Sequence, residues 1–380
     1  MGRRLFYARY DRRNGAVRGA FDGPPMEGIA LLRRVSRLLA TVAISATLAL
    51  TAACGESSTE SNDNDNGSGN NEQPGVGIAF DVGGRDDHSF NESAARGGDR
   101  AEEELGVHID YQTARNGEAD ADRVQRLTAM AQAGYNPVIG VGYLYGSAIE
   151  QVAQDFPDTT FGVVDSAPEG DNVYGMTFAE HEGSYLAGVA AALKTESGQV
   201  GFIGGVQTPL IQKFEAGYVQ GVHDTNPDID VDVRYLYTDD DRGFSDPARA
   251  AEQADAMLGD GVDVIYTAAG SSGQGAIETV AGVDGAWAIG VDSDQYQQPG
   301  LAEYQDHILT SMVKGVDVAV YDLIEAVQNG EAPHGAHEYT LAEDGVSLAT
   351  SGGFIDDIAD RIDEASQRIV NGDIEVQDTP

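Results

Sequence analysis

The sequence alternates short apolar runs with longer amphipathic runs, and this alternation restricts the fold more than any other feature. Most of the apolar runs are continuous, as is typical of parallel strands buried between two layers of helices. This alternation runs from Val76 to Lys194 and begins again at Gly198. We therefore expect an α/β protein with two doubly wound parallel sheets, which form two lobes with a cleft between their strand ends.

The same pattern predicts where each element lies. Strands are expected at 76–80, 107–112, 137–141, 160–164 and 173–178, and then at 200–204, 231–237, 262–267 and 286–291. Helices are expected at 92–105, 119–133, 147–155 and 182–194, and then at 210–225, 246–258 and 273–281. The first lobe is predicted to span 75–195 and the second 196–306. In the segment 307–380, we expect a crossover strand at 307–312 and a helix at 314–329 that pack on one lobe, with the crossovers forming a hinge, and then an extended pair within 338–353 and a helix at 355–369.

Residues 1–53 are predicted to be an N-terminal extension followed by a lipoprotein signal peptide. Arginines precede an apolar run at 38–50, which has the length of a signal peptide and is too short to span a bilayer. The run ends in Leu50-Thr51-Ala52-Ala53-Cys54, which resembles a bacterial lipobox with its leucine one position early. Because Cys54 is the only cysteine, we interpret it as the lipid-attachment site, and ordinary signal cleavage beside an incidental cysteine is the alternative. Met26 is a second candidate start residue.

The segment 54–74 is predicted to be a disordered tether, because it contains no large apolar residue after its cysteine. A signal peptide, a lipid-attachment cysteine and a tether together would anchor the folded body in the cell membrane through lipid. The body would then lie on the extracytoplasmic face.

The body is strongly acidic. Nine of the 23 basic and three of the 63 acidic residues precede Cys54, which leaves 14 basic and 60 acidic residues and a formal charge of −46. The negative electrostatic field of such a body repels the phosphates of nucleic acid and excludes nucleic acid as a partner. Since the acids are spread along the whole chain, we interpret them as a salt-adapted surface rather than a match to a cationic substrate. Lysines are so scarce that the three after Cys54 are candidates for specific roles: Lys194, Lys213 and Lys314.

Polar and aromatic residues gather at the carboxyl ends of the expected strands, where parallel sheets bind ligands. They come from both halves of the chain: Asp81, Phe90, Asn91 and Asp165, and then Phe214, the loop Gly270–Gly275, Asp292 and Lys314. Carboxylates accept hydrogen bonds from sugar hydroxyls, and aromatic faces stack on planar rings. The set therefore favours a nucleoside or a similar glycoside as the ligand.

Each member of this set also has a purely structural explanation. An aspartate at a strand end often caps the next helix, and a single phenylalanine is more often a core residue. The loop Gly270–Gly275 lacks the Lys-Ser/Thr ending of a P-loop, and Asp239-Asp240-Asp241 lacks an ordered calcium-loop signature. We therefore expect neither a cofactor nor a metal ion. The sequence leaves open whether three tyrosines line the cleft: Tyr143, Tyr145 and Tyr185.

Four motifs occur in order between residues 76 and 354. They are Asp81-x-Gly83-Gly84…Asp87-x-Ser89-Phe90-Asn91, Val200-Gly201-Phe202-Ile203-Gly204-Gly205…Phe214…Gly217-Tyr218…Gly221, Ile289-Gly290-Val291-Asp292-x-Asp294-Gln295 and Thr310-Ser311-Met312-Val313-Lys314. Together they resemble the basic membrane protein family, whose members are lipoproteins that bind purine nucleosides for ABC importers.

The resemblance implies a type I periplasmic-binding-protein fold and a nucleoside site with assigned roles. The base would lie between Phe90 and Phe214, and Asp81 and Asn91 match positions around it. Asp165 and Asp292 would hold the ribose hydroxyls with Lys314 nearby, and the loop that begins at Gly270 matches a backbone contact. An ABC permease and its ATPase would be the partners, and we expect a monomer.

The leading hypothesis is therefore a binding protein without catalytic activity, which closes on a nucleoside and delivers it to a permease. A nucleoside hydrolase on the same scaffold is an alternative, although the sequence shows no metal-ligand spacing and no Ser/His/Asp order. A sensor that docks on a membrane signalling protein is another alternative. A sugar or another small polar molecule is an alternative ligand for such a binding protein.

Overall fold

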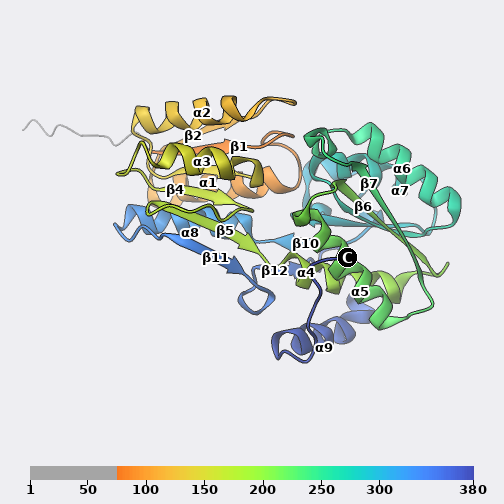
Figure 1. The fold of residues 1–380 in the computed structure, drawn as a ribbon. Helices are drawn as coiled ribbons and strands as arrows, with labels where there is room; N and C mark the ends of the chain where they lie inside the picture. Colours follow the sequence, from red (N-terminus) through yellow and green to blue (C-terminus); the bar gives the residue numbers. More distant parts are fainter. Residues whose placement is uncertain (1–74) are drawn as a thin grey trace, which may run out of the picture. The chain divides into compact units, whose positions relative to one another are not determined.

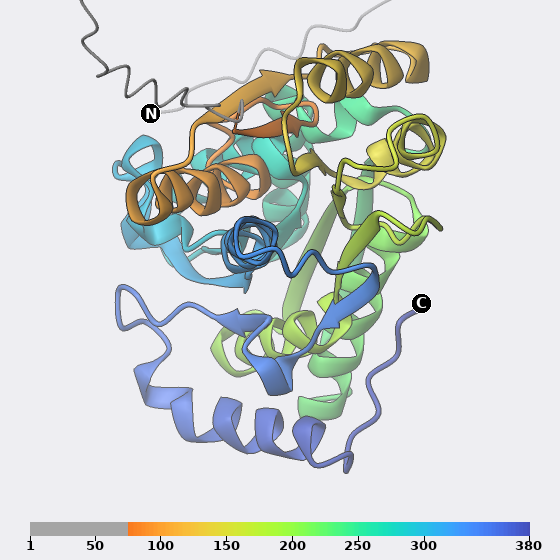
Figure 2. The same cartoon turned by 90° about the vertical axis from the view of Figure 1, so that its left-hand side faces the viewer.

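The computed structural model describes residues 75–380. The predicted extension and signal peptide at 1–53, the proposed lipid-attachment residue Cys54 and the tether at 54–74 lie outside the described residues. Within the described part, two six-stranded sheets are each flanked by helices (Figures 1 and 2). None of its helices is long and apolar enough to cross a membrane.

The first sheet has the strand order β11-β5-β4-β3-β1-β2, and every pairing in it is parallel. Its strands are β1 (Val76–Phe80), β2 (Ile109–Thr113), β3 (Val138–Val141), β4 (Phe161–Val164), β5 (Val173–Phe178) and β11 (Gly335–Tyr339). Its helices are α1 (Phe90–Leu105), α2 (Asp120–Ala133), α3 (Gly146–Ala153) and α8 (Val316–Gln328).

Side chains that alternate along each strand divide the first lobe into two apolar layers. Ala79 packs with residues of α2 and α3, whereas its neighbours Ile78 and Phe80 pack with residues of α1 and α8. All three side chains are fully buried. A strand whose two faces are both buried needs a continuous apolar run, which is what the sequence supplies at this point.

The second sheet has the order β12-β10-β9-β8-β6-β7, and only β12 is antiparallel to its neighbour. Its strands are β6 (Gln199–Val206), β7 (Asp230–Tyr237), β8 (Val264–Ala268), β9 (Trp287–Asp292), β10 (Ile308–Lys314) and β12 (Val346–Leu348). The other helices are α4 (Glu180–Lys194), α5 (Pro209–Thr225), α6 (Pro247–Asp260), α7 (Gly273–Ala281) and α9 (Ala359–Val370). Helix α9 packs against α4 (Figure 1).

The two sheets repeat one topology, because β2-β1-β3-β4-β5 in the first corresponds to β7-β6-β8-β9-β10 in the second. The prediction of two doubly wound, mainly parallel sheets is confirmed. In this topology the chain reverses its winding between β1 and β3 and again between β6 and β8, and ligands bind outside the carboxyl ends of strands at such points.

The connections between the lobes differ from the prediction. The strand expected at 307–312 and the following helix do not pack on one lobe, because β10 joins the second sheet whereas α8 packs against α1 of the first. Helix α4, placed in the first lobe by the predicted boundary at residue 195, packs on α5, and its Gly183 lies against Met312 and Val346 of the second sheet. The chain therefore crosses between the sheets after β5, after β10 and after β11.

Two predictions about the end of the chain are wrong. Lys314 does not begin a helix but is the last residue of β10, where it is in register with Val346 of β12. The extended pair expected within 338–353 is not formed, because β11 adds to β5 in the first sheet and β12 adds to β10 in the second. Each of these short strands satisfies the backbone groups of what would otherwise be an open sheet edge.

Helices α4 and α5 approach so closely that their backbones touch. A Cβ at Gly217 would overlap the carbonyl oxygen of His181, and a Cβ at Gly221 would overlap that of Tyr185. The two glycines are four residues apart and therefore share one face of α5. This contact explains, in structural terms, two of the glycines in the second sequence motif.

We predict that Gly221→Ala lowers the free energy of unfolding by about 1–3 kcal/mol, because the added methyl group forces the two helices apart. The control is Gly259→Ala, at an exposed position of α6 where nothing lies within 4 Å of the new Cβ. That variant should be neutral or more stable by up to about 1 kcal/mol, since alanine favours the helix. Urea unfolding measures both, and equal effects of the two variants would contradict the prediction.

Candidate functional site

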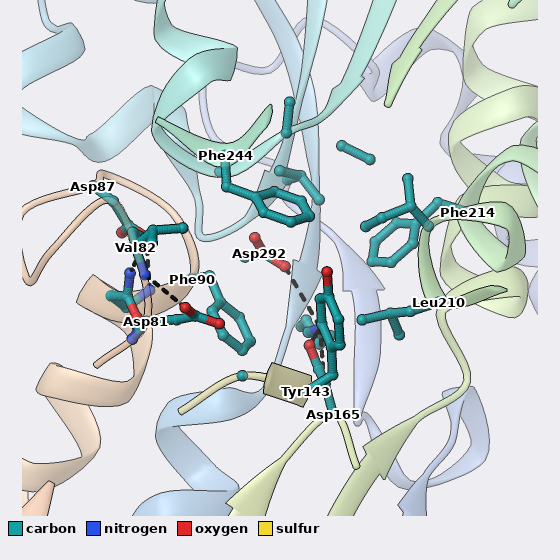
Figure 3. Close-up of a pocket in the computed structure, with 18 residues that line it drawn as sticks. Asp81, Val82, Asp87, Phe90, Tyr143, Asp165, Leu210, Phe214, Phe244 and Asp292 are labelled. Carbon is teal, nitrogen blue, oxygen red and sulfur yellow. Dashed lines mark hydrogen bonds and ion pairs between the residues drawn. The ribbon is translucent and has the colours of Figure 1, made fainter. Parts of the chain in front are cut away.

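One cavity lies where the carboxyl ends of strands from both sheets meet (Figure 3). Its empty volume is about 560 Å³ when the solvent at its mouth is included. It is lined by Asp81, Val82, Asp87, Phe90, Asn91, Gly142, Tyr143, Asp165, Leu210, Ile211, Phe214, Phe244, Ala268, Ala269, Gly270, Val291, Asp292 and Lys314. All eight residues that were predicted from the sequence to bind a ligand are in this lining, and their roles toward a ligand stay predictions.

Four aromatic side chains project toward the cavity (Figure 3). Phe90 is the first residue of α1, and Tyr143 lies in the short 3-10 helix that follows β3. From the second lobe, Phe214 lies on α5 and Phe244 ends the 3-10 helix η2 (Asp241–Phe244). The arrangement offers ring faces from both lobes, and such faces stabilise a planar ligand by stacking.

A buried lysine lies among the aromatic rings. The Nζ atom of Lys314 is 4.8 Å from the ring centroid of Phe90 and 5.5 Å from that of Phe214. The same atom donates hydrogen bonds to both carboxylate oxygens of Asp165, at 2.9 and 2.8 Å. It also lies 3.7 Å from Glu180 and 3.9 Å from Asp292.

These carboxylates keep the lysine charged. Burial alone would lower the pKa of Lys314, but the carboxylates of Asp165, Asp292 and Glu180 together hold the pKa well above its ordinary value. Burial raises the pKa of Glu180 to about 7, although Lys314 opposes the shift. The pKa of Asp292 is likewise raised by burial and drawn back by Lys314. Asp165, Asp292 and Lys314 therefore form the cavity floor, and Glu180 is a third acid that shares this buried cation.

Asp165 and Asp292 occupy the same position in the two sheets. Asp165 directly follows β4, the fourth strand of the first sheet from the β2 edge, and Asp292 ends β9, its counterpart from the β7 edge. Both have left-handed backbone conformations, with φ of 64° and 63°. Non-glycine residues adopt this conformation at a cost of about 1–3 kcal/mol, and they persist in it where the surroundings fix the chain, which is common at functional sites.

The loop that precedes α1 is held by its own side chains. The carboxylate of Asp87 accepts hydrogen bonds from the backbone N–H groups of Ser89, Asn91 and Glu92, at 2.9–3.0 Å. The side chain of Asn91 accepts from the N–H of Asp81 and donates to the carbonyl of Val82. Asn91 therefore fixes the loop through both its amide oxygen and its amide nitrogen.

Some residues of the cavity wall were not predicted from the sequence. Phe244 and Asp87 line the cavity, although neither was among the residues expected to bind a ligand. Of the tyrosines left open, Tyr143 lines the cavity, whereas Tyr145 is buried in the first lobe and donates to the carbonyl of Phe80. Tyr185 donates to Asp224, away from the site. An aromatic residue shortly after the carboxyl end of β7 was the one available signal for Phe244.

Among residues 75–380, no three His, Cys, Asp or Glu side chains are grouped so as to hold a metal ion. The acidic run at 239–241, considered for calcium, is used differently. Asp240 caps η2 and pairs with Arg242, and Asp241 pairs with Arg123.

Asp81 forms part of the cavity wall, and its titration is expected to affect the stability of the fold. Burial raises its pKa to about 7, against the opposing effects of the Val82 N–H and of Arg123. A carboxyl group whose pKa is higher in the folded state stabilises the fold while protonated. That contribution is complete below about pH 4 and is lost as the pH rises through about 7.

We therefore predict that Asp81→Asn, which cannot ionise, is more stable than the wild type at pH 8, by on the order of 2–4 kcal/mol, and that this advantage disappears near pH 4. Asp86→Asn, at an exposed position of the same loop, controls for the loss of one surface acid. Thermal midpoints between pH 4 and pH 8 test the prediction. An Asp81→Asn advantage that does not depend on pH would contradict it.

The comparisons with known proteins agree with this geometry. The family model of PnrA-like ABC transporter substrate-binding proteins (Bmp) matches residues 76–380. The CD4+ T-cell-stimulating antigen of Listeria monocytogenes is 34% identical over 361 residues, which cover 90% of this chain and 98% of the relative. The ABC transporter nucleoside-binding protein BmpA of Lactococcus lactis is 34% identical over 317 residues, which cover 79% of this chain and 88% of the relative.

A solved structure supports the same assignment. An ABC transporter solute-binding protein from Aeropyrum pernix K1 superimposes with a TM-score of 0.70 and 29% identity, over 80% of this chain and 93% of that protein. The chain is thus similar to substrate-binding proteins over nearly all of its described length. The resemblance seen in the four sequence motifs is confirmed, and the chain belongs to the PnrA-like family of ABC transporter substrate-binding proteins.

Proposed function

We propose that this protein is an extracytoplasmic lipoprotein that captures a nucleoside, a purine nucleoside first of all, and delivers it to an ABC importer. The observation that carries the proposal is the cavity between the lobes, where aromatic rings and paired carboxylates come from both lobes. A nucleoside has the matching chemistry, because it joins a planar base to a sugar with adjacent hydroxyl groups. The Lactococcus lactis relative is named as a nucleoside-binding protein, which supports the same ligand class.

The cavity divides into two regions with different chemistry. Phe90 and Phe214 would hold the base between them, and Tyr143 and Phe244 would cover its edge (Figure 3). The sugar would lie over Asp165, Asp292 and Lys314, which combine acceptors and a donor in a water-poor floor. Since a carboxylate accepts two hydrogen bonds side by side, a pair of ribose hydroxyls fits this floor.

The family supports delivery to a permease as part of this proposal, and the sequence of residues 38–74 supports membrane attachment. Lipid attachment at Cys54 and the tether at 54–74 would keep the body near a permease and its ATPase, and the body would act as a monomer. Radiolabelled palmitate incorporated by the wild type and not by Cys54→Ser would support the anchor. Equal labelling of the two would contradict it.

We predict that Phe214→Ala lowers the affinity for a purine nucleoside by tenfold to a hundredfold, because stacking of a base on an aromatic ring is worth about 1–3 kcal/mol. Isothermal titration calorimetry with adenosine, guanosine and inosine measures the change. The matched control is Phe354→Ala, which removes a ring that packs on Trp287 outside the cavity. Its affinity should stay within about twofold of the wild type. Failure of the wild type to bind any of the three nucleosides would overturn the proposed ligand class.

We also predict that the protein prefers a ribonucleoside to its 2′-deoxy analogue by at least about tenfold, because the missing hydroxyl leaves buried carboxylate oxygens without a donor. Competition calorimetry with adenosine, 2′-deoxyadenosine and free adenine measures this preference. Equal affinity for the nucleoside and the free base would contradict a sugar-binding role for Asp165 and Asp292.

The hydrolase alternative is tested with the same samples. Chromatography of adenosine incubated with the protein should show no adenine beyond the amount released without it. Release of the base in proportion to protein concentration would favour the enzyme instead.

A further inference from the structure

The segment η2 of the second lobe reaches the first lobe beside the cavity. Phe244, at its end, lines the cavity and meets the ring of Tyr143 edge to face, with centroids 6.5 Å apart and planes at 73°. Asp241, at its start, faces Arg123 of helix α2 at 3.6 Å. Two residues of one short helix thus contact two elements of the opposite lobe.

The position of η2 is fixed within its own lobe. A Cβ at Gly243 would overlap the carbonyl oxygen of Gly205 in β6, so the two backbones are in direct contact. The carbonyl of Phe244 accepts a hydrogen bond from Ser271, and the side chain of Asp240 caps the helix start. The contacts that η2 makes with the first lobe therefore form and break only when the lobes as a whole approach and separate.

Arg123 is a buried cation whose partners surround it at ion-pair distances. Its side chain is 3% exposed, and its Nε and Nη2 atoms form no hydrogen bond with the described residues. The nearest carboxylates are those of Asp120 at 3.3 Å, Asp241 at 3.6 Å, Asp81 at 3.8 Å and Glu118 at 3.9 Å. Only Asp241 belongs to the second lobe, so it is the one partner whose distance changes with lobe separation.

Arg123 also connects this contact to the cavity. Its Nη2 atom is the atom that faces both Asp241 and Asp81, and Asp81 is part of the cavity wall. A ligand that occupies Asp81 therefore changes the charge balance around the guanidinium, and the guanidinium in turn holds Asp241. Because a buried charge is costly without partners, the closed arrangement with all four carboxylates is the one in which Arg123 is best compensated.

We propose that Arg123 is a positioning residue that, through its ion pair with Asp241 across the lobes, holds the cavity closed over its ligand. The proposal rests on the proposed function, because it treats the cavity as a nucleoside site. The ligand can leave the closed cavity only after this pair has broken, so the pair governs how fast the ligand leaves.

The test compares two variants that each remove one carboxylate from Arg123. Asp241→Asn removes the partner across the lobes, and Asp120→Asn removes an exposed partner within the first lobe. Both are made in the chain that carries Cys54→Ser. Asp241→Asn should raise the dissociation rate of adenosine in stopped-flow measurements by about tenfold and leave the association rate unchanged, and Asp120→Asn should change the dissociation rate less than about twofold. Thermal midpoints without ligand should agree within about 2 °C, because neither substitution leaves a buried charge without any partner.

A second readout does not depend on the ligand. The Cys54→Ser chain contains no other cysteine, so spin labels can be placed at Gln132→Cys in α2 and Asp255→Cys in α6, two exposed positions on opposite lobes. Pulsed electron resonance should show longer distances between the labels when Asp241→Asn is added and an unchanged distribution when Asp120→Asn is added. Equal distributions for both variants, or equal dissociation rates, would overturn the proposal. Absence of nucleoside binding in the parent would overturn the proposed function instead, while the label distances still test the ion pair.

Discussion

The ammonium group of Lys314 is the interaction on which the rest of the site depends. It lies in a part of the molecule that excludes water, and a charge in such a place costs several kcal/mol unless carboxylates surround it. Its partners come from three separate segments. Asp165 follows a strand of the first sheet, Asp292 ends a strand of the second, and Glu180 begins the helix after the first crossover. The charge of Lys314 therefore connects both sheets and the helix after the first crossover. These ion pairs hold the two lobes together at the cavity floor.

Lysine is scarce in this chain, so the contacts of the few lysines that it has are informative. All three lysines after Cys54 pair with carboxylates far away in the sequence. Lys194 contacts Asp357, and Lys213 lies between Glu180 and Glu338. Because Glu180 also faces Lys314, an ionic chain runs from the cavity floor to β11 beside the third crossover. The exposed pair at Lys194 contributes little to stability, whereas the buried members of the chain cannot lose a partner without a large cost.

The sheets were predicted well because their strands carry the signal locally. Val76–Phe80 is a continuous apolar run between a glycine and an aspartate, and its bounds in the structure are those expected. The residues at the strand ends were predicted for the same reason, since parallel topology brings such ends together. Local signals failed at Lys314, whose place at the end of a buried strand depends on Asp165, 149 residues earlier in the chain.

Two other errors have the same cause. Phe244 follows an acidic run that is typical of a solvated turn, and its place in the cavity depends on the contact between Gly243 and Gly205. The strands β11 and β12 were expected to pair because they are neighbours in sequence, yet each is needed at the edge of a different sheet. In each case the deciding contact joins segments that are far apart in the sequence, and no local sequence pattern predicts it.

The repeated topology explains why a ligand in this cavity would act on the lobes. Asp165 and Asp292 hold equivalent positions, so the two sheets present matching ends to the same space. A ligand shifts an equilibrium between open and closed lobes only by its difference in affinity for the two states. When half of the ligand's partners belong to each lobe, a separated lobe offers only half of them, and that difference is large. A cavity built from both sheets would therefore couple ligand binding to lobe closure, because a ligand held by one lobe alone leaves the carboxylates and rings of the other without their partner.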